Sequence, residues 1–229
     1  MDEASGGEMM KNAVINSYFS TPVVQVRFAD NDELNAELKE LFLRKEHENA
    51  DDIINPNRFN TQFGPLFESH FDLFKWQDKP VQKLAGMMHS TLSEFVQHIN
   101  QYTPGQMQKL MFQYHAWFHI TRMGGFQTLH DHPNASWSAI YYIQAGDEVP
   151  DRPESGVVRF HDKRGFSPMY LDAGNDNIEA RFSWEAVPLK PETGMMLIFP
   201  SWLAHEILPY HGESERIMVA LNAWIQRKA

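Results

Sequence analysis

The segment "FQTLHDHPNASWSAIYYI", residues 126–143, places three chemically active side chains at the end of a β-prone run. His130 and His132 flank Asp131, a proline follows, and an aromatic, β-prone run comes next. Residues two apart on a strand share a face, so both imidazoles can point to one side and the carboxylate away from it. Two imidazoles at a strand end supply half of a metal site, of a kind that suits iron, copper, nickel or zinc.

Around this segment the chain is a series of short β-prone runs. They are separated by Gly, Pro, Asp and Asn, a spacing that favours an antiparallel sandwich or barrel. The polar segment 161–181 is expected to be a long connection between two strands. The β-prone runs are "LMFQYHAWFHITR", "SWSAIYYIQ", "GVVRFHD", "ARFSWEAVPL", "GMMLIFP", "HEILPY" and "RIMVALNAWIQ".

The N-terminal half is predicted to support this barrel. Residues 21–30 should form a strand, and a helix should follow, with Asp30 or Asn31 as its cap. A second helix is expected from Asp78 to about residue 100, with the segment 49–78 as a long ordered loop before it. The apolar face of the second helix is Val81, Leu84, Met88, Leu92, Phe95, Val96 and Ile99.

These elements suggest a single domain over residues 13–229, after a flexible tail at 1–12. Residues 13–106 would form the supporting strand and helices, and 107–229 the barrel core. The formal net charge of −10 argues against nucleic acid as a partner, because binding phosphates needs a basic face. There is no cysteine, which excludes disulfides and thiol catalysis. No signal peptide or membrane span is evident, so we expect a cytoplasmic protein with no membrane partner.

A third imidazole follows in "GMMLIFPSWLAHEILPYHGESERIMVALNAWI", residues 194–225. His205 comes after a β-prone run and a turn, and Arg216 begins the last strand eleven residues later. Between His132 and His205 lie enough residues for four or five strands of a barrel. The chain can therefore bring His205 back beside the first pair.

The motifs "HDHPNASWSAIYY", "GVVRFHDKR" and "IFPSWLAHEILPYHGESERIMVALN" resemble those of Fe(II)/2-oxoglutarate-dependent dioxygenases. Within this superfamily they are similar to a bacterial group marked by "HxHP…SWSGVYY", with Ala139 where Gly is usual. The resemblance covers roughly residues 107–226. It implies a mainly β fold with flanking helices, organised as a double-stranded β-helix (a jelly-roll or cupin-like barrel).

The resemblance also implies a site and a reaction. Fe(II) would be held by His130, His132 and His205, with 2-oxoglutarate and O2 as cosubstrates and Arg216 on the distal carboxylate of 2-oxoglutarate. Hydroxylation of a small molecule would release succinate and CO2. Two departures leave alternatives open. Most of the superfamily has His-x-Asp or His-x-Glu, so Asp131 is an alternative ligand. The usual Arg-x-Ser is Arg216-Ile-Met218 here, so Tyr142 or Asn222 would supply the missing contact to the cosubstrate.

A competing hypothesis is a cupin-like metal-dependent enzyme or sensor that does not use 2-oxoglutarate. Cupins add a ligating Glu about four residues beyond the second His, where this chain has Ser136 and Trp137. A non-enzymatic binding protein on the same barrel is a third hypothesis, and a homodimer is left open. We expect structural roles for His115, His119, His161 and His211, surface positions for His89 and His98, and core positions for Trp117, Trp137, Trp184 and Trp202.

Overall fold

The computed structural model describes residues 19–56, 61–162, 170, 172–179, 182, 183 and 185–228. The predicted tail at 1–12 and Trp184 lie outside these residues. The elements in chain order are β1 (Val24–Arg27), α1 (Asp32–Ile53), β2 (Gln62–Phe63), β3 (Leu66–Glu68), the 3-10 helix η2 (Leu73–Lys75), α2 (Lys79–Asn100), α3 (Pro104–Met107), β4 (Leu110–Thr121), β5 (Phe126–His130), β6 (Trp137–Gln144), β7 (Val158–His161), β8 (Val187–Leu189), β9 (Met195–Pro200), β10 (Ala204–Ile207) and β11 (Arg216–Arg227).

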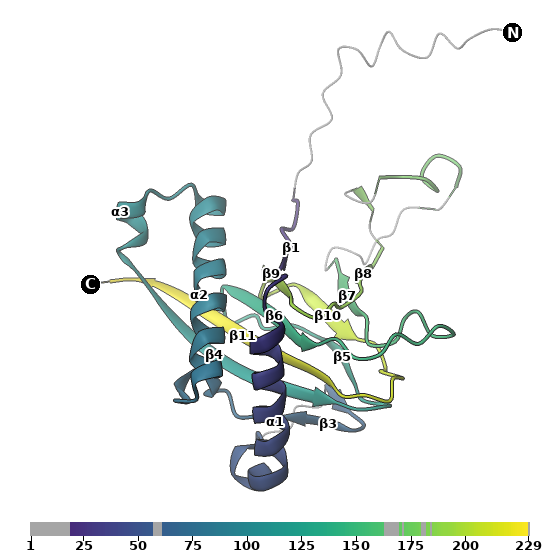
Figure 1. Ribbon diagram of the computed structural model, residues 1–229. Coiled ribbons are helices and arrows are strands. Elements are labelled where there is room, and N and C mark those ends of the chain that lie inside the picture. The colour runs from purple at the N-terminus through teal and green to yellow at the C-terminus, as the bar shows by residue number, and fades with distance from the viewer. Residues whose placement is uncertain are drawn as a thin grey trace, which may run out of the picture.

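The strands form two antiparallel sheets, which Figure 1 shows with the helices on one side. The larger sheet has the order β1-β9-β6-β11-β4-β3, and the smaller sheet has the order β2-β5-β10-β7-β8. Neighbours in each sheet are mostly distant in the chain, as a barrel wound from two sheets requires. The fold is therefore mainly β with flanking helices, a double-stranded β-helix, which confirms the predicted fold class.

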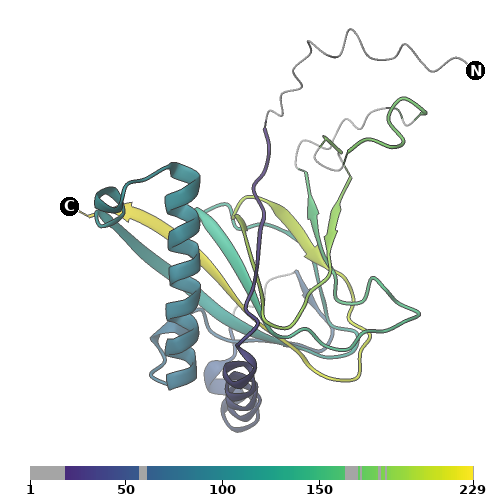
Figure 2. The same ribbon diagram turned by 45° about the horizontal axis from the view of Figure 1, so that its top comes forward.

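The two long helices cover the outer face of the larger sheet (Figures 1 and 2). Their apolar residues recur at helical spacing and pack on alternate residues of the strands. Phe42 of α1, for example, stacks on Phe118 of β4 with ring centroids 4.1 Å apart. The opposite face of the sheet carries Ile140, Tyr142 and Met218, which pack toward the smaller sheet. The helices thus leave the space between the sheets free for a site.

Both helix starts lie close to the predicted positions, but the caps differ. Asn31 occupies the N-cap position of α1 without a side-chain cap bond, and Asp78 does the same for α2. The amide of Asn31 donates instead to the Tyr141 hydroxyl at 3.1 Å, which ties the helix to the sheet. Ile99, predicted on the buried face of α2, is 43% exposed because it lies in the last turn.

The predicted loop at 49–78 was wrong over much of its length. Helix α1 continues to Ile53, and β2, β3 and η2 follow. Strands of two and three residues are too short to show a period in the sequence, and their pairing with β5 and β4 defines them. Trp202, predicted in the core, is 45% exposed on the turn between β9 and β10. Much of the predicted connection at 161–181 lies outside the described residues.

None of the helices in the described ranges is long and apolar enough to cross a membrane.

Candidate metal centre

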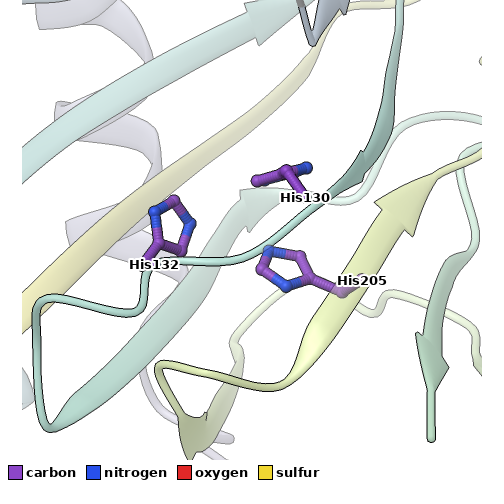
Figure 3. A group of neighbouring side chains, drawn as sticks. All are labelled: His130, His132 and His205. Atoms are coloured by element: carbon purple, nitrogen blue, oxygen red, sulfur yellow. The ribbon is translucent and has the colours of Figure 1, made fainter. Parts of the chain in front are cut away.

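Three histidines converge at one end of the smaller sheet, as Figure 3 shows. His130 is the last residue of β5 and is the register partner of His205 on β10. His132 lies two residues beyond the end of β5, where its backbone N–H donates to the carbonyl of Ser201 at 2.7 Å. That bond ties the segment after β5 to the turn between β9 and β10. The structure therefore brings together the three residues that the sequence predicted as ligands.

The imidazole rings are close enough to share one ion. One ligand atom from each lies within 4.8 Å of the others, and the ring centroids are 4.3–5.5 Å apart. Asp131 does not join this group, although its side chain lines the same cavity. A bulge does occur in β5, but it lies between Gln127 and His130 rather than at Asp131. The geometry therefore favours His132 over Asp131 as the third donor.

Hydrogen bonds determine which ring nitrogen is available. The Nδ1 of His130 lies 2.7 Å from the carbonyl oxygen of Thr128, and the Nδ1 of His205 lies 3.0 Å from that of Leu203. A carbonyl only accepts, so Nδ1 must carry the proton in both rings. The lone pair is then on Nε2, which is the arrangement that a metal-ligating histidine needs.

The surroundings keep these rings neutral. Burial lowers the pKa of His130 and holds that of His205 well below its ordinary value. Burial, together with the neighbouring charge of His130, lowers the pKa of His132 to about 4. Three neutral imidazoles near neutral pH are three donors that need lose no proton to bind a cation.

The histidines open on a cavity of about 430 Å³ between the two sheets. Met218 of β11 and Ile140 of β6 form part of its inner wall. Arg216 lies two residues before Met218 on the same strand, and Tyr142 is the register partner of Met218 on β6. Both side chains are fully buried, with the guanidinium carbon of Arg216 5.1 Å from the centre of the Tyr142 ring.

Arg216 and Tyr142 both place polar atoms in the buried interior. Nε and Nη2 of Arg216 and the hydroxyl of Tyr142 have no hydrogen-bond partner among the described residues. Burial lowers the pKa of Arg216 and raises that of Tyr142. A buried cation without a counter-charge is costly, and each buried unsatisfied group calls for an explanation. A small carboxylate beyond Met218 would satisfy all three atoms.

Asn222 also lines the cavity, but it is already engaged. Its Oδ1 lies 2.7 Å from the Ser138 hydroxyl, which lies 2.9 Å from the hydroxyl of Ser201. Because the carbonyl of Ser201 holds the backbone of His132, this network connects β11 to the metal centre. Asn222 is therefore better placed to support the centre than to bind a carboxylate beside Arg216.

The sequence analysis assigned no site role to His119 or Glu68. His119 was expected to be merely structural, and Glu68 lies in the segment predicted as a loop. Both side chains are buried and line the same cavity as the histidines. The sequence carries no local signal for this pair, because the pairing of β3 with β4 brings together residues 51 positions apart.

Comparisons with known proteins agree with this geometry. The family model described as "Putative 2OG-Fe(II) oxygenase" matches residues 115–222, a range that contains the three histidines and Arg216. No curated protein matches the chain in sequence. Among solved structures, a Pseudomonas putida prolyl-4-hydroxylase is 20% identical, with a TM-score of 0.57 and coverage of 91% of this chain and 94% of that one.

Two further structures share the fold and contain ligands. HygX from Streptomyces hygroscopicus, solved with nickel and 2-oxoglutarate, is 11% identical, with a TM-score of 0.54. The match covers 90% of this chain and 83% of HygX. The epimerase SnoN, solved with Fe3+, alpha ketoglutarate and nogalamycin RO, is 10% identical, with a TM-score of 0.61. The match covers 93% of this chain and 84% of SnoN. At these identities the likeness establishes the fold alone.

Proposed function

We propose that this chain is a 2OG-Fe(II) oxygenase that hydroxylates a small-molecule substrate, which the family match over residues 115–222 and the shared fold support. In this proposal His130, His132 and His205 hold one ferrous ion, and Arg216 with Tyr142 binds the distal carboxylate of 2-oxoglutarate. The observation that carries the proposal is the combination of three neutral imidazoles with a buried, unpaired guanidinium in one barrel.

The residues present fit both groups. Imidazole is a good donor for Fe(II), and three ligands on one side of an octahedral ion leave positions open for other molecules. The planar guanidinium of Arg216 can hold a carboxylate through two parallel hydrogen bonds, and the Tyr142 hydroxyl can donate a third. When bound, iron would let O2, the oxidant, react with 2-oxoglutarate and the substrate, each of which gives up two electrons and gains one oxygen atom; 2-oxoglutarate leaves as succinate and CO2.

The protein's own part is to bind, orient and exclude water. Thr128 and Leu203 fix the orientation of two ligand rings through their carbonyls. The apolar interior around Ile140, Phe199 and Met218 shields the inner end of the cavity from water. The volume of about 430 Å³ lies in the range typical of small-ligand sites.

The test is succinate formation by the full chain, reconstituted anaerobically with Fe(II) and then given 2-oxoglutarate and O2. We expect slow turnover alone and a large stimulation by the right metabolite in a screen of small molecules. The cupin-like alternative predicts iron binding without consumption of 2-oxoglutarate under any condition. Product masses sixteen units above the substrate would identify hydroxylation among the oxidative outcomes.

A further inference from the structure

Glu68 of β3 and His119 of β4 form a buried polar pair on the wall of the cavity. Oε2 of Glu68 lies 2.7 Å from Nε2 of His119, and the two side chains are 6% and 2% exposed. Two side-chain amides also donate hydrogen bonds to the carboxylate of Glu68. Asn55 donates to Oε1 at 2.7 Å, and Gln62 donates to Oε2 at 2.5 Å. Neither the proposed iron site nor the proposed 2-oxoglutarate site uses this pair.

The hydrogen bonds determine the proton positions in the pair. Burial alone would raise the pKa of Glu68, but the bonds from His119, Gln62 and Asn55 and the charge of His119 outweigh it and lower the pKa. An ionised carboxylate only accepts, so Nε2 of His119 carries a proton toward it. The indole N–H of Trp117 also points at Nε2, from 3.1 Å, but a nitrogen that donates to the carboxylate at 2.7 Å cannot accept from it as well. In its neutral form, His119 then has its lone pair on Nδ1.

That nitrogen has no partner in the described part of the chain. Four buried side-chain atoms there lack one: Nδ1 of His119, the Tyr142 hydroxyl, and Nε and Nη2 of Arg216. Met218 is the register partner of both His119 and Tyr142, so these residues lie side by side on one row of the larger sheet. A carboxylate at Arg216 accounts for three of the four atoms. The fourth, Nδ1 of His119, would in the neutral imidazole accept from a hydrogen-bond donor.

The rest of the lining indicates the charge and shape of that donor. The described lining residues include the carboxylates of Glu68 and Asp131 and neither lysine nor arginine. Aromatic rings form one side, with Phe71 against Trp117 at 4.8 Å and His115 against Trp224 at 4.7 Å between ring centroids. Acidic and aromatic side chains together favour a cation over an anion.

We infer that Glu68 and His119 recognise a protonated amine on the substrate, whose N–H donates to Nδ1 of His119. The imidazole then bridges the ammonium group and the Glu68 carboxylate, accepting at Nδ1 and donating from Nε2, so that the two opposite charges lie on either side of one ring. The aromatic side holds an apolar ring or chain attached to the amine. This inference rests on the proposed function, since it assigns the substrate class to the same cavity.

The test is calorimetric titration of the full chain, loaded with Fe(II) and 2-oxoglutarate under argon, with three probes of one skeleton: benzylamine, benzyl alcohol and benzoate. We expect benzylamine to bind at least about tenfold more tightly than the alcohol, and benzoate to bind most weakly. Glu68→Gln keeps the shape but removes the charge, so the amine and the alcohol should bind it about equally. His119→Leu should weaken the binding of both, while His98→Gln on the exposed end of α2 should behave as wild type.

The outcomes are distinct. Benzoate binding as tightly as benzylamine, or an undiminished amine preference in Glu68→Gln, would overturn the inference. Loss of Fe(II) or 2-oxoglutarate binding in Glu68→Gln and His119→Leu alike would also overturn it, since the pair would then be a structural support. A wild-type chain that binds neither Fe(II) nor 2-oxoglutarate, yet still selects the amine, would reject the proposed function and leave the amine site standing.

Discussion

His130 and His205 are register partners in the β5–β10 ladder, with ring centroids 4.3 Å apart, although they lie 75 positions apart in the chain. Their separation is therefore fixed by backbone pairing. His132 instead lies on a loop, which is anchored by its own backbone bond to Ser201 and by the indole N–H of Trp224, which donates to the Asn134 carbonyl at 2.6 Å. Two candidate ligands on strands and one on a tethered loop form a cluster that is largely preformed.

The first prediction concerns the metal. The protein purified anaerobically should bind about one ferrous ion per chain, and His205→Ala should lose it, because two imidazoles make a much weaker site than three. Iron content after desalting measures this directly. His161→Ala is the matched control, since His161 lies on the neighbouring strand and pairs with Glu206 on the outer side. Iron at the wild-type level in His205→Ala would contradict the three-histidine site.

The second prediction separates His132 from Asp131. His132→Ala should lose iron and succinate formation, whereas Asp131→Ala should keep both, because only His132 joins the ligand cluster. The same iron analysis, made on both variants side by side, gives the answer. The opposite pattern would mean that the segment after β5 rearranges on metal binding and that the carboxylate coordinates.

The third prediction concerns 2-oxoglutarate. Truncating one partner of a buried charge pair costs about 2–5 kcal/mol, which is roughly a thirtyfold to several-thousandfold loss of affinity. Arg216→Ala should therefore weaken 2-oxoglutarate binding steeply and leave iron binding nearly intact. Anaerobic titration of the Fe(II) protein, followed by the charge-transfer absorption of the chelate, measures both.

Two further variants sharpen this test. Arg216→Lys should recover only part of the affinity for 2-oxoglutarate. An ammonium group keeps the positive charge but lacks the two parallel N–H donors of a planar guanidinium. Glu215→Ala is the control, since the Glu215 side chain faces Arg122 at 3.9 Å, away from the cavity. If Arg216→Ala titrates like wild type, the buried guanidinium has a structural role and the case for 2-oxoglutarate loses its main support.

The fourth prediction is a pH dependence of the metal-free protein. The pKa of His132 is about 4 in the folded state and about 6.5 in an unfolded chain. The unfolded state thus binds more protons between these values, so the free energy of unfolding should fall as the pH drops from above 6.5 toward 4. His130 and His205 act in the same direction. Urea midpoints in chelator at pH 7.5 and 5.0 measure the effect.

The control for this prediction is again a histidine exchange. His132→Gln should show a smaller loss of stability between the two pH values, because one of the buried imidazoles no longer titrates. His98→Gln should lose as much stability as wild type, since His98 is exposed on α2. An equal loss in His132→Gln and wild type would mean that other groups dominate the acid sensitivity.

The sequence by itself predicted most strands of the barrel and the three histidines that meet at the candidate metal centre. Side chains two apart share a strand face, which predicted that Arg216 and Asn222 face the same way on the last strand; the same argument does not hold for His132, because β5 ends at His130. The apolar spacing of residues 81–96 likewise predicted the helix face that packs on the larger sheet. Such features depend on local geometry, which a few neighbouring residues specify.

Only the tertiary structure decided what pairing between distant segments creates. The short strands β2 and β3 carry no period of their own, and their pairing with β5 and β4 places Glu68 beside His119 in the cavity. The turn between β9 and β10 exposes Trp202, although its composition predicts burial. The missing partners of Arg216 and Tyr142 were likewise invisible in the sequence. Burial and satisfied hydrogen bonds are properties of the packed chain, because they depend on residues that no local pattern connects.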